Sequence, residues 1–567
     1  MDGKCCPGPV LDCVSMTVAD AVARILILEG VDVLFAYPLN FLIEAASKAG
    51  IRPVIVRQER TGLHMADAFS RMHSGERIGV FCMQNGPGAE NAFGGVAQAY
   101  SESAPIMVLP MGHPREWAQV QPNFNSSLNY RQVTKSCEQV TLPAHLSATL
   151  RRAFTQVRNG RPRPVLVEFP SDLLSEEVPE PFSYQPAPRI RYGPDGPSVT
   201  RAAEMLLQAE RPVIYAGQGI HYAKAWQALR EFAELLEAPV TTSLGGKSAF
   251  PEGHPLSLGS GGRSTTRMVH EFLNRADLVF GVGCSFTTTP FGLSMPSGAR
   301  FLHATLDAAD INKDVAVEHG LVGDARLVLE ALIDEIRPRL NPEGRGRAKG
   351  IAQRIQAVRK EWMAAWRPKL TASHQPLSPY RVIRDLMRTV DVANTIITHD
   401  SGSPRDQLSP FWECVSPLSY IGWGKSTQLG YGLGLAMGAK MARPDKLCIN
   451  LWGDAAIGFT GTDLETAVRE KIPILSILLN NFCMAAELQF YPTASVRHRI
   501  TDISGNYAEM ARSLGCYSER VEAAEAIVPA LERGIRKTRE GVPVLLEFMT
   551  TRETDMSVFP QPTSRSG

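Results

Sequence analysis

The sequence lacks the features that mark several classes of protein. Positive and negative charges nearly cancel, with 59 Lys and Arg against 58 Asp and Glu, so there is no basic field of the kind that nucleic-acid-binding proteins use. The strongly apolar stretches, such as Ile472–Leu479, are far shorter than the roughly 20 residues of a membrane-spanning helix. We therefore expect neither a nucleic-acid partner nor a membrane partner.

Cysteine is sparse and scattered. The ten cysteines include no CxxC pair, which in a long chain indicates reduced thiols rather than a disulfide framework. The amino-terminal sequence MDGKCCPGPVLDCVSM also has no continuous apolar run of the kind found in signal peptides. Both features are typical of a cytoplasmic protein. Cys5 and Cys6 are either a redox or metal-binding pair or part of a frayed chain end, and we favour the second interpretation.

Length and composition indicate several globular domains. The chain has 567 residues, of which 44% are hydrophobic and 21% charged, and this is enough for several hydrophobic cores. Short β-rich runs alternate with amphipathic helical patterns, and this alternation predicts βαβ units with buried parallel sheets. Segments 178–197 and 337–350, which are rich in proline, interrupt it. We predict an α/β fold of three Rossmann-like, doubly wound parallel-sheet domains at residues 1–180, 195–340 and 375–550.

The first of these domains shows the alternation clearly. The runs predicted as strands are Val31–Tyr37, Arg52–Val56, Ile78–Met83, Ile106–Pro110 and Pro164–Phe169. The helices predicted between them are Val18–Glu29, Leu42–Ala49, Gly62–Met72 and Glu90–Ser101.

The most informative stretch lies in the third domain. One apolar run ends at Gly453-Asp454, and the next strand-like run ends at Asn480-Asn481. In a right-handed β–α–β crossover both strand ends emerge at the same edge of the sheet, so Asp454 and Asn481 are predicted to meet. Their carboxylate and amide oxygens are ligands that Mg2+ takes alongside phosphate oxygens. Alternatively, both are ordinary turn residues or helix caps.

Small residues and two further turns add candidates. Gly453, Ala455 and Ala456 leave backbone N–H groups accessible to a diphosphate. Glu59 follows a predicted strand of the first domain, and the sequence QNGPGAEN begins a later helix there. Taken separately, Glu59 is a first-turn charge that the helix dipole favours, and the glycine-rich turn is a simple helix start.

Together, in this order, these three elements resemble the thiamin-diphosphate-dependent decarboxylase and carboligase family, in its acetolactate-synthase-like branch. The resemblance rests on the GD…NN pair, on Glu59 ahead of the sequence GLHMA and on GPGAEN, and it covers almost the full chain. It implies a pyrimidine-binding domain first, a central Rossmann-like domain and a diphosphate-binding domain last. It also implies thiamin diphosphate and Mg2+ as cofactors, and a homodimer or homotetramer.

The resemblance implies a role for each matching residue. Glu59 would hydrogen-bond N1′ of the aminopyrimidine and so drive a proton relay that activates the thiazolium C2. Pro87 and Asn91 would pack around that carboxylate. The implied Mg2+ ligands are Asp454, Asn481 and the backbone carbonyl of Cys483. Further cofactor contacts are implied at Tyr37, Pro38, Ser401, Gly402, Ser403, Pro404, Gln428, Leu429, Gly453, Ala455, Ala456 and Met484.

The sequence departs from the acetolactate-synthase pattern near the substrate. The residues at substrate positions are Leu39, Asn40, Phe124, Asn125, Glu487 and Phe490. Leu39 and Asn40 replace two glycines and would narrow the space near the reacting carbon. Glu487 either repels a second anionic keto acid or points outward as a solvated charge, and both interpretations stay open.

The central domain keeps the scaffold of the family but not its flavin contacts. The sequence GCSFTTTP at 283–290 stands where an Arg- and Asp-rich stretch is usual, so we do not expect FAD. A CoA-ester nucleotide is the alternative occupant of this domain. Arg263 or Arg267 would then meet its phosphates, unless both are ordinary surface charges.

We predict an enzyme that cleaves or forms a C–C bond next to a carbonyl with thiamin diphosphate and Mg2+. The leading hypothesis is a decarboxylating carboligase of a pyruvate-type 2-keto acid. The alternatives are an acyl-CoA lyase or decarboxylase, similar to 2-hydroxyacyl-CoA lyase or oxalyl-CoA decarboxylase, and a non-catalytic relative that binds the cofactor. Glu59, Asp454 and Asn481 argue against the last, because a non-catalytic binder has no use for the proton relay.

Overall fold

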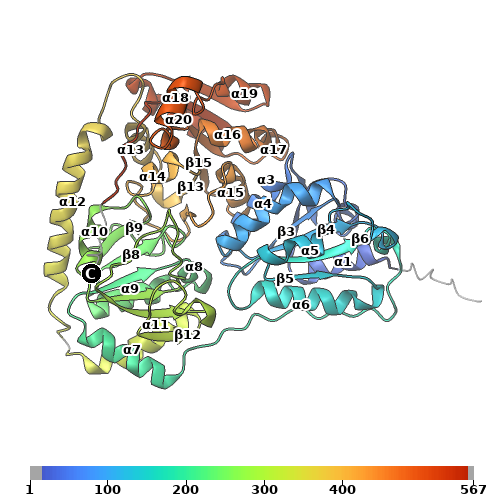
Figure 1. Ribbon diagram of the computed structural model, residues 1–567, viewed down its shortest axis with the longest axis horizontal. Helices are drawn as coiled ribbons and strands as arrows, with labels where there is room; N and C mark the ends of the chain where they lie inside the picture. The colour runs from blue at the N-terminus through green and yellow to red at the C-terminus, as the bar shows by residue number, and fades with distance from the viewer. Residues whose placement is uncertain (1–15, 342, 560–567) are drawn as a thin grey trace, which may run out of the picture.

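The computed structural model describes residues 16–341 and 343–559, so Cys5 and Cys6 lie outside the described residues. Within these ranges the chain forms three parallel sheets of six strands, each with helices packed against it (Figure 1). This arrangement confirms the predicted α/β class and its three Rossmann-like units. Among the described helices, none has both the length and the apolar character needed to cross a bilayer.

The first sheet has the strand order β2-β1-β3-β4-β6-β5. Its strands are β1 (Val33–Ala36), β2 (Arg52–Ile55), β3 (Gly79–Met83), β4 (Ile106–Gly112), β5 (Ser136–Gln139) and β6 (Val165–Pro170). The helices around it are α1 (Val18–Leu28), α2 (Leu42–Lys48), α3 (Glu59–Met72), α4 (Pro87–Ser101), α5 (Ser126–Asn129) and α6 (Leu146–Arg158). The predicted strands and helices are confirmed within a few residues. The edge strand β5, whose residues are half-buried, was missed because it is short and polar.

The central sheet has the order β12-β11-β10-β7-β8-β9. Its strands are β7 (Pro212–Ala216), β8 (Val240–Ser243), β9 (Ser257–Gly261), β10 (Leu278–Val282), β11 (Arg300–Thr305) and β12 (His319–Val322). Its helices are α7 (Gly196–Gln208), α8 (Gly219–Ala223), α9 (Trp226–Leu236), α10 (Arg267–Asn274) and α11 (Ala325–Ile336). The chain order reverses between β7 and β10, which is where open α/β sheets place a ligand crevice.

The third sheet has the order β14-β13-β15-β16-β18-β17, which repeats the strand order of the first sheet. Its strands are β13 (Thr395–His399), β14 (Tyr420–Ile421), β15 (Leu447–Gly453), β16 (Leu475–Asn480), β17 (Tyr517–Val521) and β18 (Val544–Met549). Its helices are α13 (Pro379–Thr389), α14 (Ser403–Leu408), α15 (Tyr431–Ala442), α16 (Asp454–Thr460), α17 (Leu464–Arg469), α18 (Pro492–His498), α19 (Tyr507–Ser513) and α20 (Ile527–Arg539).

A long helix, α12 (Ala348–Leu370), connects the central unit to the third along one side of the molecule (Figure 1). It begins inside segment 337–350, where the sequence pattern predicts a break between domains, and the helix was not predicted. Its buried positions Ile355, Val358 and Trp362 recur every three or four residues among charged ones. Trp362 stacks on Phe411 with ring centroids 4.9 Å apart, so this narrow apolar stripe anchors the helix.

The first and third units meet where α3 packs against α15. Two glycines of α15 allow the backbones to approach closely: a Cβ on Gly438 would lie 2.2 Å from the carbonyl oxygen of Met65, and one on Gly434 would lie 2.4 Å from Cβ of His64. No side chain fits at either position, because a Cβ atom would lie closer to these atoms than van der Waals contact allows. The helix pair therefore fixes α3, and with it the residues at its amino-terminal end.

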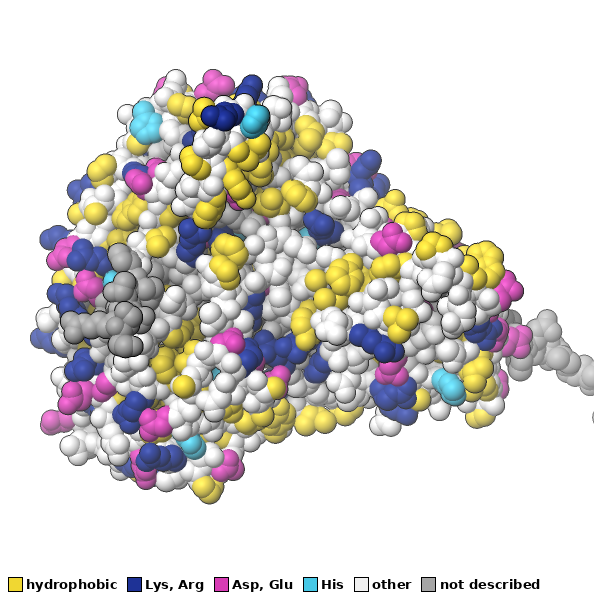
Figure 2. All heavy atoms as spheres, in the orientation of Figure 1, with side chains coloured by type: hydrophobic (Ala, Val, Ile, Leu, Met, Phe, Trp, Pro, Cys, Tyr) yellow, Lys and Arg dark blue, Asp and Glu magenta, His cyan; other side chains and the backbone are white. Residues whose placement is uncertain are grey.

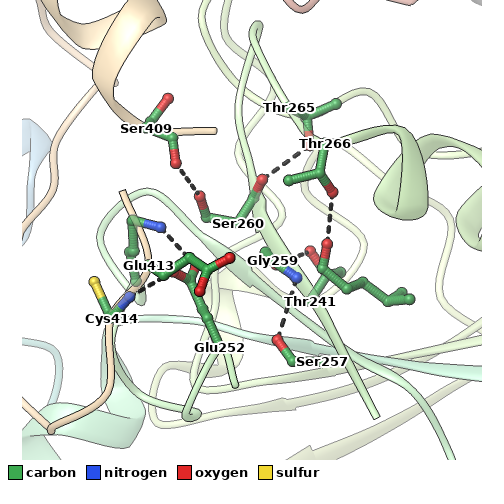
Figure 3. Close-up of polar contacts among 12 residues, drawn as sticks. Thr241, Glu252, Ser257, Gly259, Ser260, Thr265, Thr266, Ser409, Glu413 and Cys414 are labelled. Atoms are coloured by element: carbon green, nitrogen blue, oxygen red, sulfur yellow. Dashed lines mark hydrogen bonds and ion pairs between the residues drawn. The ribbon is translucent and has the colours of Figure 1, made fainter. Parts of the chain in front are cut away.

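Polar contacts join the central unit to the third (Figure 3). Oε2 of Glu252 accepts a hydrogen bond of 2.7 Å from the backbone N–H of Cys414, and Oγ of Ser260 donates to the carbonyl of Ser409 at 3.2 Å. Glu252 is also paired with Lys247 at 2.6 Å, and both side chains are buried. Glu252 thus contacts both units at once, because one of its oxygens meets Lys247 and the other meets Cys414.

Candidate cofactor and active site

Glu59 is the first residue of α3 and is buried, with 3% of its surface exposed. The helix begins three residues earlier than the predicted start at Gly62, so Glu59 belongs to its first turn. The side chain of Asn91, from the first turns of α4, hydrogen-bonds the carboxylate. Gly88 leaves space beside it, because a Cβ there would lie 3.5 Å from Oε1 of Glu59. Pro87 is the first residue of the same helix.

Burial raises the pKa of Glu59 above its ordinary value, and hydrogen bonds from its own backbone and from Asn91 oppose this. Asp463 raises it further through like-charge repulsion. Asp463 itself lies in the third unit and is fully buried. It accepts hydrogen bonds from the backbone N–H of Arg57 at 2.8 Å and from Oγ1 of Thr61 at 2.7 Å. A carboxylate of the third unit therefore holds the segment that carries Glu59.

Helix α4 positions the loop that leads into α15. Oε1 of Glu102 accepts backbone hydrogen bonds from Gly424 at 3.0 Å and Ser426 at 3.1 Å. Nε2 of Gln428 donates to the carbonyl of Gly94 at 2.6 Å, and the backbone N–H of Gln428 donates to Oε1 of Gln98 at 3.3 Å. Leu429 packs as a partly buried side chain against the core cluster shared by the first and third units. The loop expected to meet the aminopyrimidine is thus fixed by contacts with the first unit.

Asp454 and Asn481 meet, as their places at the ends of β15 and β16 predict. Oδ2 of Asp454 accepts backbone hydrogen bonds from Asn481 at 3.2 Å and from Cys483 at 3.0 Å. Oδ1 accepts from the backbone N–H of Ala455 at 3.0 Å. Burial raises the pKa of Asp454, whereas these three backbone donors favour the ionised form. The Asp454 carboxylate therefore makes the hydrogen bonds of a turn residue and is also a candidate ligand for a cation.

The residues around Asp454 fit a divalent cation. The amide oxygen Oδ1 of Asn481 is buried and has no hydrogen-bond partner among the described residues, although such an oxygen normally finds one. Within the same residues there is no cluster of three or more His, Cys, Asp or Glu side chains that could hold a metal alone. A cation here would therefore need amide and carbonyl oxygens as well, which is the ligand set of Mg2+.

Ser401, Gly402, Ser403 and Pro404 lie beside Gly453. A Cβ on Gly453 would lie 3.6 Å from Cγ of Pro404, and Gly402 has a φ of 76°. A buried carboxylate, Asp400, organises this loop: Oδ1 accepts from the N–H groups of Ser401 at 2.8 Å and Gly430 at 3.0 Å, and Oδ2 from Gly432 at 3.0 Å. Burial raises the pKa of Asp400 to about 6. The loop that begins at Asp400 thus lies next to the strand end that carries Gly453 and the candidate ligand Asp454.

The candidate substrate residues of the first unit fall into two groups. Leu39 is 59% exposed, next to Pro38, which is also exposed, and Tyr37, which is half-buried. Asn40 is buried, and its Nδ2 donates to the carbonyls of Met83 at 2.8 Å and Leu109 at 3.1 Å. Its side chain therefore ties two strand ends together, and its substrate role stays a prediction.

Phe124 and Asn125 lie before α5. Phe124 packs edge-on against Tyr130 with ring centroids 6.3 Å apart, and the hydroxyl of Tyr130 donates to the carbonyl of Ala89 in α4. The Asn125 side chain caps α5 by accepting from the N–H of Leu128 at 3.0 Å. Phe124 thus contacts, through Tyr130, the helix that carries Asn91. The side-chain oxygen of Asn125 already accepts a hydrogen bond from Leu128.

The segment after Cys483 contains the last candidates. The backbone N–H of Met484 donates to the carbonyl of Thr501 at 2.8 Å. Glu487 is exposed to solvent, and Phe490 is 66% exposed. Both interpretations of Glu487 therefore stay predictions.

Segment 283–290, where the flavin contacts of the family are missing, lines a cavity of about 180 Å³ near the switch point of the central sheet. Residues of the first unit, such as Glu102 and Arg161, line the same cavity. Phe286, from this segment, is buried and packs between Tyr215 and His303, with ring centroids 5.7 Å and 4.8 Å away. Small-molecule sites usually enclose about 300 to 1,000 Å³. This cavity is therefore small for a dinucleotide.

Comparison with known proteins identifies the family. Models of the thiamine pyrophosphate enzymes match in three places: the N-terminal TPP binding domain at residues 16–138, the central domain at 199–332 and the C-terminal TPP binding domain at 400–548. The acetolactate synthase isozyme 3 large subunit of Escherichia coli (strain K12) is 31% identical over 487 residues, covering 82% of each chain. The chain belongs to the thiamine pyrophosphate enzymes.

Two other relatives cover almost the whole chain. A probable acetolactate synthase large subunit of Methanococcus aeolicus is 27% identical over 569 residues, covering 96% of this chain and 94% of its own. The glyoxylate carboligase of Escherichia coli O157:H7 is 27% identical over 575 residues, with the same coverage. This thiamine pyrophosphate enzyme is therefore of the carboligase and decarboxylase type, in the acetolactate-synthase-like branch, and thiamin diphosphate is its cofactor.

Four polar side chains that shape the site of this thiamine pyrophosphate enzyme were missed from the sequence: Gln98, Glu102, Asp400 and Asp463. All four are buried and accept backbone hydrogen bonds from other segments. Asp400 could have been predicted from the sequence, because it directly follows the buried strand β13, just as Asp454 follows β15. Glu102 and Asp463 carried none, since their partners lie in a different unit.

Proposed function

We propose that this chain is a thiamin diphosphate- and Mg2+-dependent carboligase that decarboxylates a pyruvate-type 2-oxo acid and joins the remaining fragment to an acceptor. One observation carries the proposal: Asp454 and Asn481 meet at the edge of the third sheet, and Oδ1 of Asn481 has no hydrogen-bond partner among the described residues. The names of the relatives support the substrate class, because they refer to acetolactate synthesis and to carboligation of glyoxylate.

In this proposal the third unit holds the diphosphate end of the cofactor. Asp454, Asn481 and the carbonyl of Cys483 would hold Mg2+, whose charge would offset that of the phosphates. Backbone N–H groups of two loops would approach the phosphate oxygens. Those loops comprise Ser401, Gly402, Ser403 and Pro404, and Gly453, Ala455 and Ala456. Gln428, Leu429 and Met484 would contact the rings, and from the first unit so would Tyr37, Pro38, Pro87 and Asn91.

When bound, thiamin diphosphate supplies the electron sink that allows a C–C bond next to a carbonyl to break or form. Glu59 would hold and move a proton at its carboxylate oxygen, facing the aminopyrimidine. Its raised pKa supports this role, since a carboxyl group that shares a proton needs a pKa nearer to the working pH than that of an exposed glutamate. Asn91 would orient the carboxylate.

We also infer that the active form is a homodimer or a larger homo-oligomer. Several apolar side chains are exposed on the described surface, and in Figure 2 hydrophobic atoms gather on the upper part of the molecule. One set, Phe490, Tyr491, Val496 and Ile500, follows the candidate cation ligands in the chain, and another pair, Leu39 and Phe41, follows Tyr37. Exposed apolar groups of this kind mark protein interfaces. Light scattering would measure the oligomeric state.

The test of the function is turnover of pyruvate by the purified protein. We expect CO2 release and a carboligation product that require both thiamin diphosphate and Mg2+. Conversion of a 2-hydroxyacyl-CoA or oxalyl-CoA, without turnover of pyruvate, would instead support the acyl-CoA alternative. Tight cofactor binding with no reaction on either substrate class would support a non-catalytic relative.

A further inference from the structure

The turn that carries the candidate cation ligands Asn481 and Cys483 is shaped by the residue before them, Asn480. Asn480 is the last residue of β16 and is fully buried. Its Oδ1 accepts a hydrogen bond of 2.9 Å from the backbone N–H of Phe482. In such a turn a side-chain oxygen takes the place of a backbone carbonyl, and Asn481 is the residue that the turn encloses. The Asn480 side chain therefore helps to determine where Asn481 points.

A second buried residue, Glu547 of β18, fixes the orientation of the Asn480 amide. Oε1 of Glu547 accepts a hydrogen bond from Nδ2 of Asn480 at 2.7 Å, and β18 pairs with β16 in the third sheet. Because a carboxylate accepts and cannot donate, the amide nitrogen must face Glu547, and the amide oxygen is left to face Phe482. Glu547 thus acts on the turn through Asn480.

The other contacts of Glu547 are also with donors. Its Oε2 accepts from the backbone N–H of Ala508, in the first turn of α19, at 2.9 Å. The guanidinium of Arg520 reaches both oxygens, with Nε at 3.2 Å from Oε2 and one terminal nitrogen at 3.1 Å from Oε1. The Glu547 side chain is wholly buried, whereas 32% of the Arg520 side chain is exposed. This place therefore requires a group that only accepts, and a carboxylate meets that requirement.

Helix α19, which Glu547 contacts, also reaches the other ligand. Oη of Tyr507, the first residue of this helix, lies 3.3 Å from the carbonyl oxygen of Asp454 and 3.2 Å from that of Ser504. Ala508 is the next residue along the chain. One buried carboxylate therefore holds both the turn that carries Asn481 and the helix end that contacts Asp454.

We propose that Glu547 is a positioning residue that makes the cation site select Mg2+ over Ca2+, acting through Asn480. The proposal rests on the proposed function, in which Asp454, Asn481 and Cys483 hold the cation, and adds the feature that determines which cation is held. Mg2+ demands near-ideal octahedral geometry with bonds of about 2.0–2.1 Å, whereas Ca2+ accepts irregular geometry and bonds of about 2.3–2.6 Å. A turn fixed by buried contacts meets the first demand, and a loosened turn still meets the second.

Two variants loosen the turn in different ways. Glu547→Gln keeps the size of the side chain but sets an amide nitrogen against groups that all donate, so at least one contact with Asn480, Ala508 or Arg520 is lost. Asn480→Ala removes the hydrogen bond with Phe482 and leaves Glu547 paired with Arg520. The second variant therefore tests the same turn without leaving the buried carboxylate unpaired.

A matched control lies on the neighbouring strand β17. Glu519 is ion-paired with Arg533 of α20, whose nitrogens reach its two oxygens at 2.9 Å and 2.6 Å. Its other side-chain partner is Tyr517 of the same strand. Glu519→Gln therefore makes the same substitution in the same sheet and also breaks an ion pair with arginine, but it leaves the Asn480 turn unchanged.

The test measures the binding of Mg2+ and of Ca2+, each titrated calorimetrically into the full chain with thiamin diphosphate in excess. In Glu547→Gln and in Asn480→Ala we expect the affinity for Mg2+ to fall at least about tenfold, the effect of losing one positioned hydrogen bond. The affinity for Ca2+ should fall less than about threefold, and Glu519→Gln should keep the ratio of the unaltered protein. A variant that is merely less stable would lose affinity for both cations equally, because both bind the same folded fraction. Equal losses, or an unchanged ratio in either turn variant, would overturn the proposal.

Turnover of pyruvate separates this proposal from the carboligase function. If the unaltered protein does not turn over pyruvate but its preference for Mg2+ depends on Glu547, the function is refuted and the positioning role stands. If pyruvate is turned over and Glu547→Gln keeps the cation preference of the unaltered protein, the positioning role is refuted and the function stands. If neither cation binds to the unaltered protein, both are refuted.

Discussion

The backbone N–H of Asn481 donates to Oδ2 of Asp454 at 3.2 Å, although the two residues are 27 positions apart. The contact leaves the side-chain oxygen of Asn481 without a partner among the described residues, so the two residues together present a carboxylate and a free amide oxygen. Because this contact uses the backbone of Asn481, a substitution of the side chain removes the amide oxygen but keeps the contact with Asp454.

We expect Asp454→Ala to abolish Mg2+-dependent binding of thiamin diphosphate, because the phosphates then lack their bridge to the protein. Asn481→Ala keeps the backbone contact, and we expect it to weaken binding by at least about tenfold. Titration calorimetry with and without Mg2+ measures both. Asp445→Ala, at an exposed position, is the control and should bind normally. Unchanged affinity in Asn481→Ala would refute its assignment as a ligand.

The meeting of Asp454 and Asn481 could be predicted because it depends on a general rule: parallel strands joined by right-handed crossovers end at one edge of the sheet. The three sheets could be predicted from the alternation of strand and helix patterns along the chain. The roles of Glu102 and Asp463 could not be predicted, because each accepts hydrogen bonds from a loop of another unit. The local pattern of apolar residues does not show how the units pack against one another. Helix α12 was missed because its buried stripe is narrow and its other positions are mostly polar or charged.

Glu59→Gln should leave thiamin diphosphate bound but slow turnover at least about a hundredfold, the usual effect of removing a positioned proton-transfer group. The amide fills the same space beside Asn91 but cannot share a proton. Exchange of the C2 proton of the bound cofactor, followed by NMR, measures the affected step directly. Glu90→Gln changes an exposed glutamate of α4 and should exchange normally. Near-normal exchange in Glu59→Gln would disprove the role.

Gly438→Val should weaken the packing of α15 against α3, which joins the third unit to the first. The new Cβ would lie 2.2 Å from the carbonyl oxygen of Met65, and overpacking typically costs about 1–3 kcal/mol. We expect a lower thermal unfolding midpoint and faster proteolysis between the units. Gly350→Ala lies in α12 with open space around it, so it should be neutral or stabilising. If both variants behave alike, close contact of α3 and α15 is not required.

The purified protein should show no flavin absorbance band. The side chain of Phe286 packs against Tyr215 and His303 in the central unit, and the remaining cavity of about 180 Å³ is small for a dinucleotide. Absorbance spectroscopy and mass spectrometry of released small molecules give the measurement. A yellow protein with stoichiometric FAD would show that this segment rearranges to admit it. Release of a CoA species would instead favour the acyl-CoA alternative.

Asp400 should make stability fall as the pH rises from about 4 to about 6. Its pKa is raised from 3.8 to about 6 in the folded protein by burial. Over that interval the folded state therefore binds more protons than the unfolded state, and the contribution of this group decreases by up to about 3 kcal/mol. Asp400→Asn does not titrate, so its thermal unfolding midpoint should vary less across the same range than that of the unaltered protein.

Asp391→Asn is the control. Asp391 is exposed, and its pKa is lowered mainly by a hydrogen bond from the Asn394 side chain. Asp391 therefore contributes no loss of stability over this interval. If Asp400→Asn and the unaltered protein show parallel pH profiles, the buried carboxylate keeps its charge throughout, held by the three backbone N–H groups of Ser401, Gly430 and Gly432.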